Sequence, residues 1–109
     1  MEFKATPTFA KAFKRLRKKY RHLDQDINLL RSTLMKNPTL GIPLGAGLYK
    51  IRLASSDMAK GKSGAFRVIY YLWLDINTIV LLDLYAKSEK EEVPVSELKK
   101  ILEEFLKKT

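Results

Sequence analysis

The sequence predicts an α+β fold in the order β-α-α-β-β-β-α. Three observations support this class: apolar residues at helical spacing in the first third, β-branched and aromatic runs in the middle, and an amphipathic stretch at the end. We expect a helical hairpin packed on one face of a small, mainly antiparallel sheet, followed by a C-terminal helix. The chain has 109 residues, so residues 1–109 are predicted to form a single domain.

The first third is predicted to contain a short strand and two helices. The segment "EFKAT" fits an edge strand before Pro7, and Thr8 is the expected N-cap of the next helix. Apolar side chains then recur twice at offsets of four, seven and eleven residues, with a break near residues 21–24 and an end at Pro38. The two stripes are Phe9, Phe13, Leu16 and Tyr20, and then Leu23, Ile27, Leu30 and Leu34.

The rest of the chain is predicted to contain three strands and a helix. Residues 37–49 are expected to be a loop because of their Pro and Gly content, and strands are expected at 48–54, 65–74 and 78–86. The segment "LDINT" predicts a hairpin turn, and Trp73 is expected to pack in the core. Ser96 is the expected N-cap of the last helix, whose apolar face would consist of Leu98, Ile101, Leu102, Phe105 and Leu106.

The composition favours a polyanionic partner. The net charge is +9, and the excess is uneven: residues 1–70 contain fifteen Lys and Arg against four acids, whereas residues 71–109 contain six against eight. The absence of cysteine excludes disulfides and thiolate metal sites. Because the start has no apolar leader and the longest apolar run is "VIYYLWL", we expect a cytoplasmic protein that does not bind membranes.

Alternation along the strands predicts a basic face on the sheet. Side chains in a strand point alternately to its two faces. If the three strands form a meander, one open face carries Lys50, Arg52, Arg67, Asp83, Tyr85 and Lys87, while Leu82, Leu84 and Ala86 lie opposite. Such a face is either a cationic groove or a solvated face that protects the sheet from aggregation.

Further basic residues flank this face. The loop "MAKGKSG" carries Lys60 and Lys62 beside Arg67 and resembles an anion-binding segment. Three lysines of the first helix are candidate RNA contacts, although a solvated helix face explains them too. They are Lys14, Lys18 and Lys19. The acids at 89, 91 and 92 are interpreted as solvating the segment after the third strand.

Three sequence blocks, which lie within two stretches of the chain, resemble a known toxin superfamily. The stretch "YKIRLASSDMAKGKSGAFRVIYY", followed by "VLLDLYAKSEKEEV", is similar to the RelE/ParE superfamily of type II toxin–antitoxin toxins, and most of all to its HigB-like branch. The similarity extends over residues 37–92. It implies a RelE-like toxin that cleaves mRNA in the ribosomal A site as a metal-independent endoribonuclease. It also implies a cognate antitoxin, expected to be a helix-turn-helix DNA-binding protein. By the same resemblance the site residues are Lys50, Arg52, Arg67, Tyr85 and Lys87.

The chemistry expected of these residues is transesterification by the RNA's own 2′-hydroxyl, with no cofactor. Lys50, crowded by other cations, is the candidate base, and Arg52 and Arg67 would hold the scissile phosphate. Tyr85 or Lys87 would supply the proton to the leaving oxygen, or Tyr85 would stack on a base. His22 lies between the predicted helices, so a histidine-based mechanism is not expected. With no second His or Cys, a capping or solvent-exposed role is expected instead.

Two other functions remain open from the sequence. A toxin resembling the ParE branch would act on DNA gyrase without a nuclease groove, and a degenerate toxin would only bind its antitoxin. The basic set on the sheet face favours the nuclease.

Overall fold

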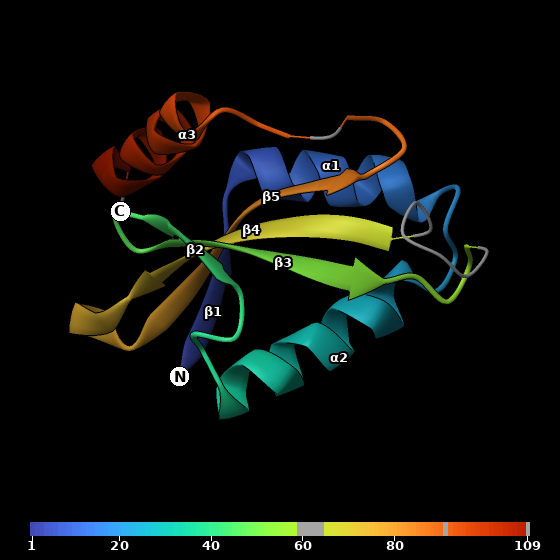
Figure 1. Cartoon of the computed structure of the whole chain (residues 1–109), viewed down its shortest axis with the longest axis horizontal. Coiled ribbons are helices and arrows are strands. Elements are labelled where there is room, and N and C mark those ends of the chain that lie inside the picture. Colours follow the sequence, from blue (N-terminus) through green and yellow to red (C-terminus); the bar gives the residue numbers. More distant parts are fainter. Residues whose placement is uncertain (59–64, 91, 109) are drawn as a thin grey trace.

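The chain forms one mixed sheet of five strands with helices on both faces (Figure 1). The computed structural model describes residues 1–58, 65–90 and 92–108. The elements in chain order are β1 (Glu2–Ala5), α1 (Pro7–Arg17), α2 (Leu23–Lys36), β2 (Ile42–Gly45), β3 (Leu48–Ala54), β4 (Ala65–Trp73), a 3-10 turn (Leu74–Ile76), β5 (Thr78–Ala86) and α3 (Val95–Lys107). The α+β class and the order of the predicted elements are therefore confirmed, with one strand added.

The strands lie in the order β1-β5-β4-β3-β2. β1 runs parallel to β5, and every other pair is antiparallel. The predicted meander of the three central strands is thus correct. Because β1 joins beyond β5, the first strand of the chain and the last strand of the meander lie side by side.

The loop predicted over residues 37–49 is wrong in part, because it contains β2. This strand pairs with β3 at the sheet edge, with a register shift between Pro43 and Gly45. An edge strand tolerates proline because its N–H side can face solvent. The tight turn into β3 has positive φ at Gly45, Ala46 and Gly47, a conformation that glycine adopts without strain. The Pro and Gly residues that predicted a loop are therefore compatible with a short hairpin.

Helix boundaries differ from the prediction at two N-termini. Thr6, not Thr8, caps α1: its Oγ1 accepts a hydrogen bond from the Phe9 N–H at 3.1 Å and donates one to the Leu82 carbonyl at 2.7 Å. Pro7 occupies the first turn, where its missing N–H costs nothing. α3 starts directly after Pro94 without a side-chain cap, so Ser96 lies inside the helix. β4 ends at Trp73, one residue earlier than predicted.

Two apolar clusters hold the layers together. The first lies between the sheet and the α1–α2 hairpin and includes Leu16, Leu23, Leu34, Phe66 and Val68. The second lies on the other face, where Leu98 and Leu102 of α3 contact it, and half-buried Trp73 packs against it as expected. The predicted helical hairpin on one face is confirmed. In the described part of the chain, no helix combines the length and apolar character that a membrane crossing requires.

Candidate nucleic-acid interface on the sheet

Three of the predicted site residues form a row across the central strands. Arg52 of β3 lies directly opposite Arg67 of β4, and Arg67 lies opposite Tyr85 of β5. The neighbours of Arg67, Phe66 and Val68, belong to the cluster under α1 and α2. Because side chains alternate, this row lies on the other face, which also carries α3. We call these three residues the arginine row.

Lys50 lies one step along the same face. It pairs with Ile69, which in turn pairs with Asp83. The Lys50 Nζ is 3.8 Å from a carboxylate oxygen of Glu92, in the segment between β5 and α3. The Glu92 side chain is 79% exposed and the Lys50 side chain 24% exposed. Glu92 therefore does more than solvate its segment, because it provides a counter-charge beside the predicted base.

Tyr85 is the most enclosed member of the arginine row. The residue is only 1% exposed, and its hydroxyl is buried with no hydrogen-bond partner in the described part of the chain. Burial raises the pKa of the Tyr85 phenol, while the Arg67 charge works against that shift. The hydroxyl therefore keeps its proton at neutral pH and remains a potential donor. At this exposed fraction neither a ring face nor the hydroxyl is open to a nucleotide, so both roles expected of Tyr85 remain predictions.

The regular alternation of side chains between the two faces of the sheet breaks down next to Asp83. The register of β4 with β5 shifts between Ile69 and Tyr70, whose partners are Asp83 and Leu81. Leu82 is left between these pairs, and it packs in the same cluster as Tyr85. The prediction that Leu82 faces away from Tyr85 is therefore wrong, because the extra residue of a bulge changes the alternation. Asp83 is 5% exposed, and burial raises the pKa of its carboxyl group.

Lys90 is a site neighbour that the sequence reasoning missed. Its Nζ lies 5.3 Å from the centre of the Tyr85 ring, within the range of a cation–π contact. Its charge also lowers the pKa of Asp83 against the effect of burial. Lys90 lies beyond the end of β5, where strand alternation no longer applies. The only sequence indication was a basic residue inside the acidic run "SEKEE".

The remaining predicted residues are spread over different places. Half-buried Lys87 follows β5, and its backbone N–H donates to the Ala65 carbonyl at 3.1 Å. Lys60 and Lys62 lie outside the described residues. The exposed lysines Lys14, Lys18 and Lys19 lie on or just after α1, which covers the opposite face of the sheet. The structure therefore brings together Lys50, Arg52, Arg67 and Tyr85, and it separates them from the α1 lysines.

His22 does not cap α2 through its side chain, although it occupies the N-cap position. Its imidazole Nδ1 instead pairs with an Asp57 carboxylate oxygen at 2.7 Å. Among the described residues, no three His, Asp or Glu side chains converge as metal ligands would.

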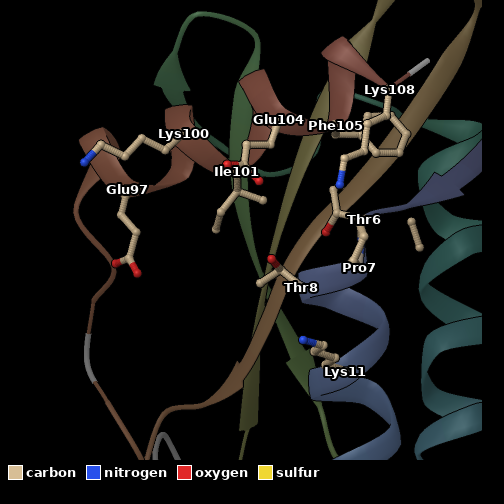
Figure 2. Close-up of a pocket in the computed structure, with 11 residues that line it drawn as sticks. Thr6, Pro7, Thr8, Lys11, Glu97, Lys100, Ile101, Glu104, Phe105 and Lys108 are labelled. Atoms are coloured by element: carbon tan, nitrogen blue, oxygen red, sulfur yellow. The ribbon is translucent and has the colours of Figure 1, made fainter.

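A cleft of about 650 Å³ lies apart from the arginine row, between the start of α1 and α3. Figure 2 shows Glu97 and Ile101 of α3, and Lys108 directly after it, on one wall, with Thr6 and Thr8 on the other. None of the arginine-row residues lines this cleft. Its walls carry both acids and lysines, so it has no single charge preference.

Comparison with known proteins gives a match at the level of fold. No protein-family model matches the chain. Among solved structures, the chain is similar to the free state of the E. coli toxin RelE, in a mutant with two arginines changed to alanine. The TM-score is 0.57 at 13% sequence identity, with 83% of this chain and 86% of that chain covered. The resemblance to the RelE/ParE superfamily is thereby supported in its fold, and the chain has a RelE-like α+β fold.

Proposed function

We propose that the chain is the toxin of a type II toxin–antitoxin system. In this proposal it is a single-domain, HigB-like member of the RelE/ParE superfamily that cleaves mRNA in the ribosomal A site. The observation that supports it most is the pairing of Arg52 with Arg67 on adjacent strands, with Tyr85 in the same row. The RelE-like fold is consistent with this function.

The opposed arginines indicate an anionic ligand. Directly opposite residues on antiparallel strands have Cβ atoms about 4.5–5.5 Å apart, and like charges there destabilise the sheet. A phosphate between the two guanidinium groups converts this repulsion into attraction, because each group can donate two hydrogen bonds to phosphate oxygens. The scissile phosphate of RNA is such a ligand, and its charge increases in the phosphorane transition state.

The other residues of the site supply proton transfer in this proposal. Lys50 takes the proton from the 2′-hydroxyl, which attacks the phosphorus, and the bond to the 5′-oxygen breaks. Tyr85 or Lys87 gives a proton to that oxygen. The Tyr85 hydroxyl is protonated but buried, so it acts as the donor only if RNA binding opens a path to it. These steps require neither a metal ion nor a cofactor, because the nucleophile belongs to the RNA.

Glu92 gives the site an intramolecular competitor. Only the neutral amine of a lysine can accept a proton, and a carboxylate nearby favours the charged ammonium form. In this proposal RNA displaces Glu92 from Lys50 and so removes that obstacle to its action as a base. A phosphate backbone held by Arg52 and Arg67 would repel the exposed carboxylate and assist this displacement.

The proposal includes two partners and a compartment. The ribosome with its mRNA is the target, so the toxin acts in the cytoplasm. The cognate antitoxin, a helix-turn-helix DNA-binding protein, would block the basic face or add bulk that prevents entry into the A site. A net charge of +9 favours an acidic antitoxin segment.

Pulse labelling after induced expression tests this function. We expect incorporation of labelled amino acids to stop within minutes while thymidine incorporation continues, and we expect Arg21→Ala, an exposed arginine away from the row, to behave like the parent. If DNA synthesis stops first, the gyrase-directed alternative is correct. If neither stops although the chain binds its antitoxin, the protein is a degenerate toxin.

A further inference from the structure

The turn after β3 is held by a buried carboxylate of α2. Asp26, in the first turn of that helix, is 7% exposed. One of its carboxylate oxygens accepts a hydrogen bond from the Ser56 N–H at 3.0 Å, and the other accepts one from the Ser56 hydroxyl at 2.5 Å. Both acceptor atoms of a buried acid are therefore directed at one residue of the turn.

A second contact joins the same two segments, but here the acid lies in the turn and the donor lies at the start of α2. The carboxylate of Asp57 accepts hydrogen bonds from the backbone N–H of His22 at 2.8 Å and from its imidazole Nδ1 at 2.7 Å. The Asp57 N–H in turn donates to the Ser55 hydroxyl at 3.1 Å. The only histidine of the chain is thus joined to the only acid between β3 and β4. Together, the two acids fix residues 55–57 to the start of α2.

This attachment lies next to the arginine row. The β3–β4 ladder ends where Ala54 pairs with Ala65, two residues beyond Arg52. Ladder ends fray when nothing holds the chain that leaves them. The contacts of Asp26 and His22 hold the chain directly after this end, so they limit the movement available to Arg52.

We propose that Asp26 and His22 are positioning residues for the arginine row. They hold the turn at residues 55–57, keep the end of β3 paired with β4, and so maintain Arg52 in place to share a phosphate with Arg67. This inference depends on the proposed RNA-binding role of the row. Neither residue touches the RNA, and the part played by His22 varies with pH.

The pH dependence follows from the groups that face the imidazole. The hydrogen bond to Asp57, and then its charge, raise the pKa of His22 above its ordinary 6.5; Asp26 adds to this and Arg21 opposes it. The same pairing lowers the pKa of Asp57 from its ordinary 3.8. The ion pair is therefore fully present between about pH 4 and 6.5. It weakens as pH rises through the raised pKa of His22, and it also weakens in acid as pH falls through the lowered pKa of Asp57.

Hydrogen exchange tests the attachment independently of nuclease activity. We expect the protection factors of the backbone amides of residues 53–57 to fall between pH 6 and pH 8.5. The size of the fall should equal the ratio of two acid dissociation constants of His22: the one with the turn detached from α2, and the one with His22 paired to Asp57. His22→Asn keeps a side-chain donor that does not titrate, so its protection should be constant over this range. If the fall persists in His22→Asn, a group other than His22 causes it and the inference is wrong.

Binding of a short single-stranded RNA tests the positioning itself. We expect Asp26→Ala to bind about tenfold more weakly than the parent at pH 6, and Asp26→Asn to recover most of the loss, because its amide can still bond to Ser56. Ser56→Ala provides a milder variant should Asp26→Ala not fold. Circular dichroism identifies the folded variants, and a purely structural contact would leave their RNA affinity unchanged.

The control for simple charge is Lys36→Gln, which removes one exposed positive charge at the other end of α2 without touching the turn. If this variant weakens RNA binding at pH 6 as much as raising the pH from 6 to 8.5 weakens it in the parent, the effect is electrostatic and the inference fails. If the protection factors are constant from pH 6 to pH 8.5 in a chain that still cleaves mRNA, the inference is wrong but the proposed function stands. A parent chain that neither binds RNA nor cleaves mRNA overturns the proposed function as well.

Discussion

At the scale of single residues, Arg67 has the most constrained position in the proposed site. It lies on the central strand of the three-strand meander, with Arg52 on one side and Tyr85 on the other. Its side chain is half-buried, and one guanidinium nitrogen donates to the Phe66 carbonyl at 3.3 Å. A cation held in this way is already oriented when charge develops on a bound phosphate.

We therefore expect Arg67→Ala to be the most damaging single substitution in the row. Cleavage on programmed ribosomes should fall by about 10²- to 10³-fold, as removal of a preorganised charge-stabilising group does in other enzymes. Circular dichroism and antitoxin binding would establish that the variant is folded. If the folded variant cleaves mRNA as fast as the parent, the row is not the active site.

Substitution of Glu92 is expected to have the opposite effect, which is tighter binding of RNA. Glu92→Gln removes the carboxylate beside Lys50 and should tighten binding of single-stranded RNA by about two- to fivefold, the size of an exposed ion pair. Glu103→Gln is the matched control, because it makes the same charge change on an exposed position of α3. Fluorescence anisotropy at low salt would measure both. Equal tightening in the two variants would mean that only net charge matters.

At the scale of elements, the sheet divides the basic residues into two sets. α1 packs on one face and exposes its lysines there, whereas the arginine row lies on the other face. Arg15 of α1 joins the two sides at the edge, since its guanidinium pairs with Glu89 after β5 at 2.7 Å. Two basic surfaces on opposite faces are suited to different tasks, and in the proposed function one would bind the ribosome and the other the mRNA.

The α1 lysines should therefore affect binding and leave the cleavage step unchanged. Changing Lys14, Lys18 and Lys19 together to Ala should weaken ribosome binding and reduce the slope of log affinity against log salt by about 2 to 3. The cleavage rate in a preformed complex should remain close to that of the parent. Lys36, Lys99 and Lys100 changed to Ala provide a control with the same loss of charge. A triple variant that binds normally but fails to cleave would place the active site on α1.

At the scale of the whole molecule, charge is distributed unevenly along the chain. The positive excess lies in residues 1–70, which build both basic surfaces except for the end of β5 and the segment that follows it. Residues 71–109 carry a slight excess of acid, including the carboxylate that pairs with Lys50. The last part of the chain thus partly neutralises the face built by the first part.

If the proposed function is correct, this distribution predicts that the cognate antitoxin associates under electrostatic control. The association rate should fall by about tenfold or more when salt is raised from low to several hundred millimolar, whereas dissociation should change little. Stopped-flow mixing of the two purified proteins would measure both rates. A rate that does not depend on salt, with an antitoxin that is not acidic, would leave steric exclusion as the means of inhibition.

Sequence patterns alone predicted the α+β class, the helical hairpin and the bounds of β3 and β5. These features follow from periodicity and turn residues, which are local properties of the chain. The same local rules placed Arg52 and Arg67 on one face, because both lie in regular strands. β2 was missed because its Pro and Gly residues indicate a loop unless the neighbouring strand is known.

The neighbours of each site residue depend on how the elements pack in three dimensions. The bulge near Asp83 arises from the pairing of two strands, so no count along β5 could place Leu82. Three contacts arise because separate segments of the chain pack together. They are those of Lys90 with Tyr85, of Glu92 with Lys50, and of His22 with Asp57. Contacts between residues far apart in the chain depend on the packing of the whole core. A local sequence pattern therefore cannot predict which distant residue will lie beside a given side chain.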